Sequence, residues 1–339
     1  MTDFKSYIAV LASGAPLARD EAKAAFSLIF QGEATPAQLG AFLMGLRLRG
    51  ETLDEIIGAA EAMRAVMTPV EAPLGAIDIV GTGGDGAGTY NISTLAAIIA
   101  AAAGAIVAKH GGKAASSLSG ASDVLGELGV KVGISSNAAA SSLREAGICF
   151  MAATTHHPAM RHAATVRSEL GVRTIFNLLG PLCNPARVER QTIGVFSRDW
   201  LEPLARALRE LGAKRVWLLH GSDGLDEATT TGVTHVVALE DGQIRAFDFS
   251  PEDAGLPRTT TQELVGGDAA HNARALRAVL EGAKNAYRDV AALNAGVALI
   301  VAGRAANVRE GVALAEAALD SGAAREKLDT LIRYSNREA

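Results

Sequence analysis

The sequence predicts an α/β fold, with a small all-helical N-terminal domain followed by a larger α/β domain that has a mainly parallel central sheet. Apolar residues recur at helical spacing throughout residues 3–67. A proline-punctuated linker, 68–73, then interrupts the helices. Beyond it short apolar strands alternate with longer helices, which is typical of a parallel sheet covered on both faces. We therefore expect a helical domain over 1–72 and an α/β domain over 73–339.

Start signals support the N-terminal helices. Thr35 and Pro36 offer a cap and a proline at the first helical position, and Thr52 with Glu55 matches a capping box. Another helix is expected to follow residues 17–20. These signals predict a compact set of short helices before the linker.

In the second domain the expected strands are Ile77–Val80, Ala105–Lys109, Ile148–Ala152, Gln191–Phe196, Arg215–His220 and His235–Leu239. The expected helices between them include Ser93–Ala103, Ser122–Leu128, Asn137–Ala146 and Leu201–Leu211. A basic helix interrupts the alternation between 158 and 184, and the tail after Ala269 is predicted to be helical. Ligands of such sheets bind at the carboxyl ends of the strands.

A glycine-rich stretch, 81–94, follows the first strand and leads into a helix near Ser93. Glycines allow positive φ and close approach to a ligand, and a helix N-terminus offers free N–H groups, so this pattern favours a phosphate site. Polar arms come from Thr89, Asn91, Ser93 and Thr94. The alternative is an ordinary tight connection, but five glycines in residues 81–88 exceed what a turn requires.

Part of this stretch also matches the dinucleotide pattern G-x-G-x-x-G, through Gly81, Gly83 and Gly86. That pattern requires a helix at the third glycine and an acidic residue about 20 positions on. Here the helix comes later, and the next strand ends in the basic pair Lys109 and His110. A phosphorylated sugar is favoured over a dinucleotide.

Two further loops carry groups for phosphate chemistry. Residues 109–117 combine two lysines, a glycine pair and two serines, which predicts a second phosphate-binding wall. Asp226 and Glu227 follow another strand end. Alone such a pair is usually surface charge, but beside phosphate loops it predicts a magnesium site, which Ser93 could complete.

Three arginines, Arg161, Arg167 and Arg173, recur at spacings of six. One that faces the cleft could clamp a carboxylate, while interhelical salt bridges are the alternative for Arg161 and Arg173. His156 and His157 lack the spacing of a zinc site. The sequence shows no nucleophile with a recognisable base partner, so a covalent mechanism has no support.

Composition bounds the class of protein. The 339 residues are 49% hydrophobic and 20% charged, with a net charge of −5, which argues against a nucleic-acid partner. No signal peptide is expected, and the longest apolar run, 95–108, is short for a membrane span. The two cysteines, Cys149 and Cys183, show neither a disulfide framework nor metal-ligand spacing, which indicates the cytoplasm.

Taken together, several motifs resemble the anthranilate phosphoribosyltransferase family of tryptophan biosynthesis, over nearly the whole chain. The matching pieces are GTGGDGAGTYNIST (81–94), KHG (109–111), SSLSGASDVLGELG (116–129), HHPAMRHAATVRSELGVRTIFNLLGPLCNP (156–185), GSDGLDE (221–227) and LNAGVALIVAG (293–303). The resemblance implies transfer of phosphoribosyl from phosphoribosyl pyrophosphate to anthranilate. It also implies a homodimer formed through the helical domain, an active site at a hinge, and a segment near 165–185 that joins the helical domain in space.

The resemblance also implies roles for individual residues, none of them a general base. Phosphoribosyl pyrophosphate would contact Gly81, Gly84, Asp85, Thr89, Asn91, Ile92, Ser93, Thr94, Lys109, His110, Gly111, Gly112, Lys113, Ala114, Ala115, Ser116, Ser117 and Ala121. Anthranilate would contact Gly81, Gly112, His157, Arg167, Gly180 and Pro181. Ser93, Asp226 and Glu227 would hold Mg²⁺, with two ions expected beside the pyrophosphate.

One departure from the family pattern affects the acceptor. The family usually reads Lys-His-Gly-Asn-Arg where this chain has Gly112 and Lys113. Loss of a side-chain amide costs about 1–3 kcal/mol if its partner stays buried. The remaining alternatives are a phosphoribosyltransferase or nucleoside phosphorylase for another aromatic or base acceptor, and a non-catalytic relative that binds nucleic acid.

Overall fold

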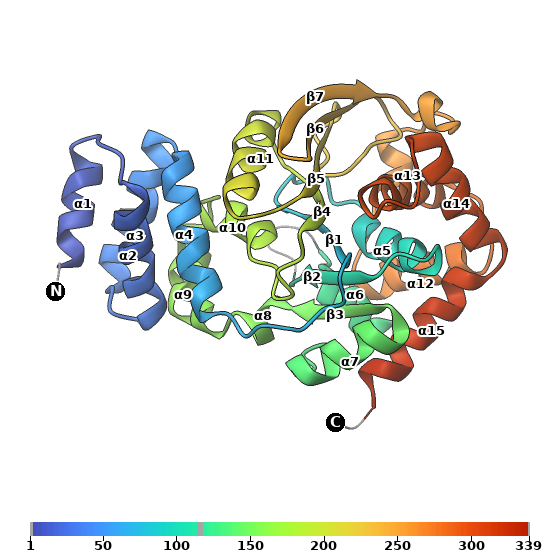
Figure 1. The fold of residues 1–339 in the computed structure, drawn as a ribbon, viewed down its shortest axis with the longest axis horizontal. Helices are drawn as coiled ribbons and strands as arrows, with labels where there is room; N and C mark the ends of the chain where they lie inside the picture. The colour runs from blue at the N-terminus through green and yellow to red at the C-terminus, as the bar shows by residue number, and fades with distance from the viewer. Residues whose placement is uncertain (1–2, 114–117, 338–339) are drawn as a thin grey trace.

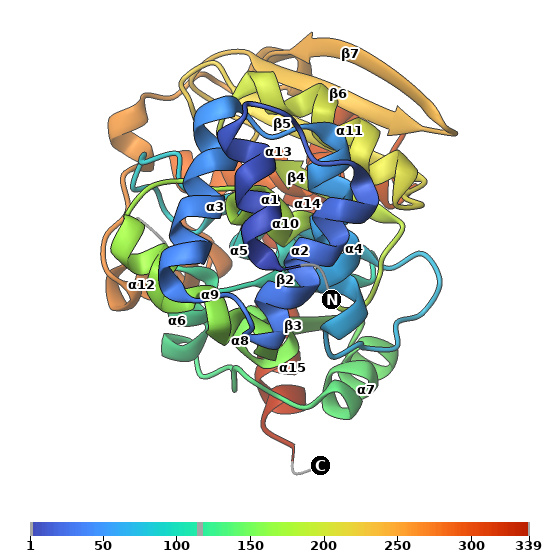
Figure 2. The same ribbon diagram turned by 90° about the vertical axis from the view of Figure 1, so that its left-hand side faces the viewer.

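The computed structural model describes residues 3–113 and 118–337, which form a helical bundle beside a sheet covered by helices (Figure 1). The bundle comprises α1 (Phe4–Ala12), α2 (Arg19–Gln31), α3 (Pro36–Arg49) and α4 (Leu53–Val66). In the turned view it lies in front of the sheet (Figure 2). Two expected start signals are confirmed: Thr35 accepts a hydrogen bond from the Gln38 N–H and Thr52 accepts one from the Glu55 N–H.

In the described part of the chain seven strands form one sheet in the order β3-β2-β1-β4-β5-β6-β7. They are β1 (Ile77–Gly81), β2 (Val107–Gly111), β3 (Ile148–Ala152), β4 (Arg190–Gly194), β5 (Arg215–Gly221), β6 (Thr234–Glu240) and β7 (Gln243–Phe249). Neighbours from β3 to β5 pair in parallel, whereas β6 and β7 pair antiparallel. The mainly parallel sheet is therefore confirmed. The order reverses between β1 and β4, which creates a topological switch point there.

Strand β7 was not predicted, and the pairing of β6 differs from the parallel arrangement expected. The two strands are joined by Asp241 and Gly242, whose φ angles are 50° and 78°. An Asp-Gly pair with positive φ at both positions is the signal of a two-residue hairpin. Residues along β7 are mostly exposed or half-buried, so the strand lacks the apolar run by which the others were predicted.

The remaining helices are α5 (Ile92–Ala102), α6 (Ala121–Glu127), α7 (Ser136–Ala146), α8 (Ala153–His156), α9 (Arg161–Leu170), α10 (Phe176–Leu182), α11 (Leu201–Glu210), α12 (Ala269–Leu280), α13 (Ala286–Val301), α14 (Val308–Asp320) and α15 (Ala323–Ser335). Short 3₁₀ turns lie at Pro158–Met160, Arg198–Trp200, Pro251–Ala254 and Thr261–Leu264. None of the helices in the described residues is long and apolar enough to cross a membrane.

The sheet is buried on both faces. On one face Ile77 and Ile79 of β1 pack with α5, α13 and the C-terminal helices. On the other Val80, together with residues of β4 and β5, packs with α10, α11 and the bundle. This two-sided burial explains why the parallel strands read as apolar runs.

Helices α9 and α10 connect the sheet domain to the bundle. Helix α9 packs against α2 and α3, and α10 packs against α4. The Phe176 ring of α10 lies 5.8 Å from the Phe26 ring and 6.3 Å from the Phe30 ring, both of α2. A segment from the middle of the chain thus shares the apolar core of the N-terminal helices.

Candidate active site

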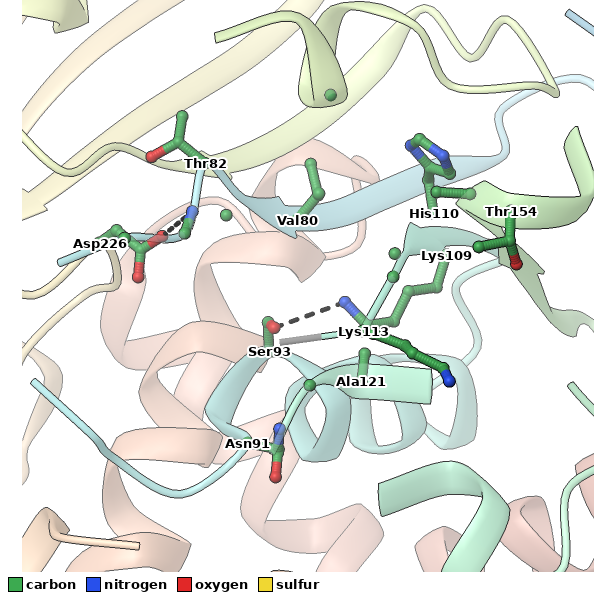
Figure 3. A pocket seen from close by; sticks show the side chains of 18 of the residues that line it. Val80, Thr82, Asn91, Ser93, Lys109, His110, Lys113, Ala121, Thr154 and Asp226 are labelled. Carbon is green, nitrogen blue, oxygen red and sulfur yellow. Dashed lines mark hydrogen bonds between the residues drawn. The ribbon is translucent and has the colours of Figure 1, made fainter. Parts of the chain in front are cut away.

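A cavity of about 730 Å³ lies at the carboxyl ends of β1 and β2, beside the switch point of the sheet. Its walls come from both loops predicted to bind phosphate, from α9 and α10, and from Met63 of the bundle. Figure 3 shows Lys109, Ser93, Asn91 and Asp226 around this space. Segments far apart in the sequence therefore build a single site.

The glycine loop reaches from the end of β1 to the start of α5. Gly83, Gly84, Gly86 and Gly88 all have positive φ, between 62° and 80°, a conformation that glycine adopts without strain. The helix begins only at Ile92, more than one helical turn of sequence beyond Gly86. The N–H groups of its first turn lie at the cavity end of the helix, where they favour an anion. The prediction that this is no dinucleotide-binding turn agrees with the late start of α5.

The acidic pair Asp226 and Glu227 lies against this loop. Asp226 Oδ2 accepts a hydrogen bond from the Gly83 N–H at 2.7 Å, and the Asp226 N–H donates to Asp85 Oδ2 at 3.4 Å. Burial, and then the charges of Glu227 and Asp85, raise the pKa of Asp226 well above its usual value. Burial raises the pKa of Glu227 to about 7 against the opposing charge of Lys109. The two carboxylates would therefore be stabilised in their charged form by an additional cation.

Two glycines on neighbouring strands make room for these carboxylates. A Cβ on Gly81 would lie 2.5 Å from Asp226 Oδ2, and a Cβ on Gly194 would overlap the Asp226 carbonyl group. Gly81 and Gly194 are register partners on β1 and β4. Glycine is therefore required on both strands, because any side chain there would collide with the loop that carries Asp226 and Glu227, hereafter the acidic loop.

The donor set fits a magnesium ion that is shared with a ligand. Asp226 and Glu227 offer carboxylate oxygens, and Ser93, whose hydroxyl accepts a hydrogen bond from Lys109 Nζ, lines the same cavity. Within the described residues no group of three or more His, Cys, Asp or Glu side chains could hold a metal. Magnesium is typically bound by one or two carboxylates together with phosphate oxygens and water.

Lys109 is the buried cation of this region. Its Nζ donates to the Ile79 carbonyl at 2.5 Å and to Ser93 Oγ at 3.4 Å, the second bond being drawn in Figure 3. Burial lowers the pKa of Lys109, while the charges of Asp78, Glu227 and Asp226 act to raise it. The Lys109 ammonium therefore lies between the carboxyl end of β1 and the start of α5.

Neutral rings line the opposite end of the cavity. The rings of His110 and His157 lie 5.0 Å apart, and none of their four nitrogens forms a hydrogen bond within the described part of the chain. Burial lowers the pKa of His110 to about 3 and that of His157 to about 4. Both imidazoles are neutral at physiological pH, which suits an aromatic ligand.

Arg167 adds one positive charge to this end. Its guanidinium carbon lies 5.1 Å from the centre of the Phe176 ring, and burial lowers its pKa. No carboxylate of residues 3–113 or 118–337 pairs with it. A half-buried arginine without an anionic partner, beside neutral rings, fits the carboxylate of an aromatic acid.

The cavity brings together most of the predicted site residues. Those that line it are Gly81, Gly84, Asp85, Thr89, Asn91, Ile92, Ser93, Lys109, His110, Gly111, Gly112, Lys113, Ala121, His157, Arg167, Gly180, Asp226 and Glu227. Thr94 and Pro181 do not line it: Thr94 is buried in α5, and Pro181 is buried in α10 with its carbonyl bonded to Gln191. Ala114, Ala115, Ser116 and Ser117 lie outside the described residues.

Several lining residues were not predicted. Met63, Tyr90, Met160 and Phe176 contribute apolar walls. Tyr90 belongs to the glycine-rich stretch predicted to bind phosphate, but no role was predicted for its ring, which stacks on Tyr287 with the ring centres 4.4 Å apart. Met63 had no signal, because its place in the cavity depends on how the bundle docks.

Arg161 and Arg173 do not form the salt bridges that were the alternative for them. Neither pairs with a carboxylate within 3–113 and 118–337. The Arg173 guanidinium instead lies 4.5 Å from the centre of the Phe196 ring. Arg161 lines the cavity.

Comparisons with known proteins agree with this arrangement. Residues 5–67 match the helical bundle domain of a glycosyl transferase family, and residues 74–325 match its a/b domain. The chain is 63% identical over 337 residues to an anthranilate phosphoribosyltransferase of Methylocella silvestris, and the match covers 99% of this chain and 97% of that protein.

Two solved structures show the same architecture. The chain resembles anthranilate phosphoribosyltransferase from Thermus thermophilus with a TM-score of 0.92 and 42% identity, over 98% of this chain and 99% of that one. It also resembles the Saccharomyces cerevisiae enzyme in complex with PRPP and Mg, with a TM-score of 0.90 and 30% identity, over 98% and 97% of the chains.

Proposed function

The chain belongs to the glycosyl transferase family that its two domains match, and from this premise we propose that it is an anthranilate phosphoribosyltransferase. It transfers the phosphoribosyl group of phosphoribosyl pyrophosphate to the amine of anthranilate and releases pyrophosphate, in the biosynthesis of L-tryptophan. One observation carries the assignment: the glycine loop and the carboxylate pair line the same cavity as two neutral imidazoles and an arginine that lies against the Phe176 ring.

The phosphate end binds and orients the donor substrate. The glycine loop and the first turn of α5 offer N–H groups, and Lys113 adds positive charge at the cavity wall. We place the pyrophosphate here, beside Asp226, Glu227 and Ser93, which would hold Mg²⁺. The metal, when bound, neutralises charge that develops on the leaving pyrophosphate. Two ions are proposed because two carboxylates adjoin one strand end.

The acceptor end positions anthranilate. Arg167 would bind its carboxylate, and His110 and His157 would lie against its ring. Such placement aims the amine at the ribose carbon, so that positioning and electrostatic stabilisation supply most of the rate. We assign no residue as general base.

We further propose two domains, 1–72 and 73–339, with the active site at the hinge between them. The cavity takes Met63 from α4 and the remaining walls from the second domain, and α9 and α10 belong with the bundle by their packing. Movement of the bundle would open or close the acceptor end.

A homodimer through the helical domain is also proposed. Helix α3 carries a row of exposed or half-buried apolar residues, Ala37, Ala41, Met44 and Leu48, and Leu48 is 81% exposed. Spacings of four, three and four place this row on one helix face. A cytoplasmic location is proposed because Cys149 and Cys183 are both buried and unpaired.

The test is the loss of anthranilate fluorescence in the presence of phosphoribosyl pyrophosphate and Mg²⁺. The reaction should stop when a chelator removes the metal and resume when Mg²⁺ is returned. If folded protein shows no turnover, the acceptor assignment is wrong. Other aromatic amines, nucleosides with phosphate, and DNA at several salt concentrations would then identify the alternative.

A further inference from the structure

Helix α13 packs against both α5 and α14, and the three lie on the same side of the molecule (Figure 1). Every residue from Ala286 to Val301 except the half-buried Asp289 is buried. Two of its polar residues, Tyr287 and Asn294, are seven positions apart, so they lie on one face of the helix. Another, Arg288, pairs with Glu316 and Asp320 of α14. Neither Tyr287 nor Asn294 lines the cavity itself.

Asn294 is bonded to the backbone of the residue that follows the acidic pair. Its Oδ1 accepts a hydrogen bond from the Ala228 N–H at 2.9 Å, and its Nδ2 donates to the Ala228 carbonyl at 2.8 Å. Nδ2 also donates to the Val290 carbonyl at 2.8 Å, one turn back on α13. The amide is only 1% exposed, and all three bonds are made in the core.

The hydrogen bonds between Asn294 and Ala228 fix the acidic loop on the side that faces α13. On its cavity side the loop touches β4 so closely that a Cβ on Gly194 would overlap Asp226. On the other side both backbone groups of Ala228 are matched by one side chain, as they would be by a neighbouring strand. A buried peptide that loses such partners must either move or remain unsatisfied.

The same helix face also touches the phosphate loop. The Tyr287 hydroxyl donates to the carbonyl of Asn91 at 3.2 Å, at the start of α5, and its ring stacks on Tyr90. Helix α13 therefore contacts both the start of α5 and the acidic loop. The distance between the start of α5 and the acidic loop determines whether a metal bound by Asp226 and Glu227 could also contact a phosphate bound at the N-terminus of α5.

We propose that Asn294 is a positioning residue that sets the Asp226 and Glu227 carboxylates for the metal that accompanies phosphoribosyl pyrophosphate. This inference rests on the proposed function. Asn294 does not touch substrate or metal, and it acts through Ala228. The carboxamide supplies all three bonds at once, because its oxygen accepts from the Ala228 N–H while its nitrogen donates to the carbonyls of Ala228 and Val290.

The test compares Asn294→Asp and Asn294→Leu with the parent by calorimetric titration of phosphoribosyl pyrophosphate in excess Mg²⁺. The aspartate retains the acceptor for Ala228 but loses both donors, and the leucine loses every polar contact. Both variants should bind the Mg²⁺ complex about 10-fold more weakly or worse. Their KM for anthranilate, measured at saturating donor, should stay within about 2-fold of the parent value, since the acceptor end is not involved.

Amide hydrogen exchange supplies a readout that needs no turnover. A peptide that spans 223–231 should exchange faster in both variants without ligand, while a peptide from β3 should not change. Leu299→Ala is the matched control, because it shortens a buried side chain of the same helix, five positions from Asn294 and therefore on a different helix face. It should lower the melting temperature but leave the affinity for the Mg²⁺ complex within about 2-fold.

The outcomes separate this inference from the proposed function. Failure of the parent protein to bind phosphoribosyl pyrophosphate with Mg²⁺ would contradict the proposed function. Parent-like affinity in a folded Asn294 variant, or equal weakening by Leu299→Ala, would overturn the positioning role alone. Loss of folding in both Asn294 variants would also overturn it, because the residue would then determine folding and not the metal loop.

Discussion

The backbone N–H of Gly83 donates to the Asp226 carboxylate at 2.7 Å, across 143 positions of sequence. This bond joins the glycine loop to the acidic loop directly. Because Asp85 also accepts a bond from the Asp226 N–H, the two loops contact each other in both directions. A phosphate bound by the glycine loop would therefore lie next to a metal bound by the acidic loop.

Substitution of Gly194 should disrupt this junction. In Gly194→Ala the new Cβ would overlap the Asp226 carbonyl, so the acidic loop must shift away from β4. We expect a loss of stability of about 1–3 kcal/mol and a higher Mg²⁺ concentration for half-maximal activity. Urea unfolding and a magnesium titration measure the two effects. Gly126→Ala is the control, since its Cβ meets nothing within 4 Å, and parent-like magnesium response in Gly194→Ala would contradict the prediction.

Arg167→Ala should weaken acceptor binding selectively. Charge-assisted hydrogen bonds contribute about 1.5–3 kcal/mol, so the KM for anthranilate should rise roughly 10- to 100-fold. The KM for phosphoribosyl pyrophosphate should change little, because the donor is proposed to bind at the glycine loop and the acidic pair, away from Arg167. Ser168→Ala, a neighbour on α9 that does not line the cavity, should match the parent. Equal changes in both KM values would show that the arginine does not act on the acceptor alone.

Gly112→Asn tests the departure from the family pattern. Gly112 lines the cavity, and a Cβ there would meet only the Ala153 side chain at 3.7 Å, an ordinary contact. The asparagine should therefore fit and supply the missing amide. We expect the KM for anthranilate to fall about 5-fold or more, by the estimate for one satisfied polar group. An unchanged anthranilate KM would mean that position 112 does not matter for the acceptor.

Asp78 should make stability depend on pH. Burial raises its pKa from 3.8 to about 6, against the opposing charge of Lys109, and its carboxylate accepts bonds from the His110 N–H and Asn184 Nδ2. The folded state thus holds the proton more tightly than the unfolded state. The stabilising contribution is fully present below about pH 4 and is lost as the pH rises through about 6.

The measurement is urea unfolding of the parent and of Asp78→Asn at pH 5 and pH 7.5. From pH 5 to pH 7.5 the free energy of unfolding of the parent should fall by roughly 1–2 kcal/mol more than that of the variant. Asp329→Asn, an exposed site on α15, should show no such difference. If the free energy of unfolding changed equally with pH in the parent and in Asp78→Asn, the raised pKa of Asp78 would be refuted.

Leu48→Asp should prevent dimer formation. The change places a charge within the exposed apolar row of α3, where a partner subunit would have to bury it. Sedimentation velocity should show a dimer for the parent and a monomer for the variant. Leu74→Asp is the matched control, because Leu74 is 98% exposed but lies outside the bundle. A monomeric parent would show that the row has another role.

Much of the fold was predictable because its signals are local. The helix starts at Thr35 and Thr52 depend on side chains three residues apart, and the apolar runs of β1 to β5 follow from burial on both faces. The edge strand β7 was missed because it is mostly exposed and therefore lacks the apolar run by which the other strands were predicted.

By itself the sequence determined which residues can bind phosphate and metal: glycines that adopt positive φ, a helix start, and adjacent carboxylates. Only the tertiary structure decided which of them meet. It buried Thr94 and Pro181 away from the cavity, brought Met63 into it, and placed Asn294 behind the acidic loop. The physical reason is that backbone preferences act over a few residues, whereas a cavity is formed by side chains whose directions depend on how distant elements pack.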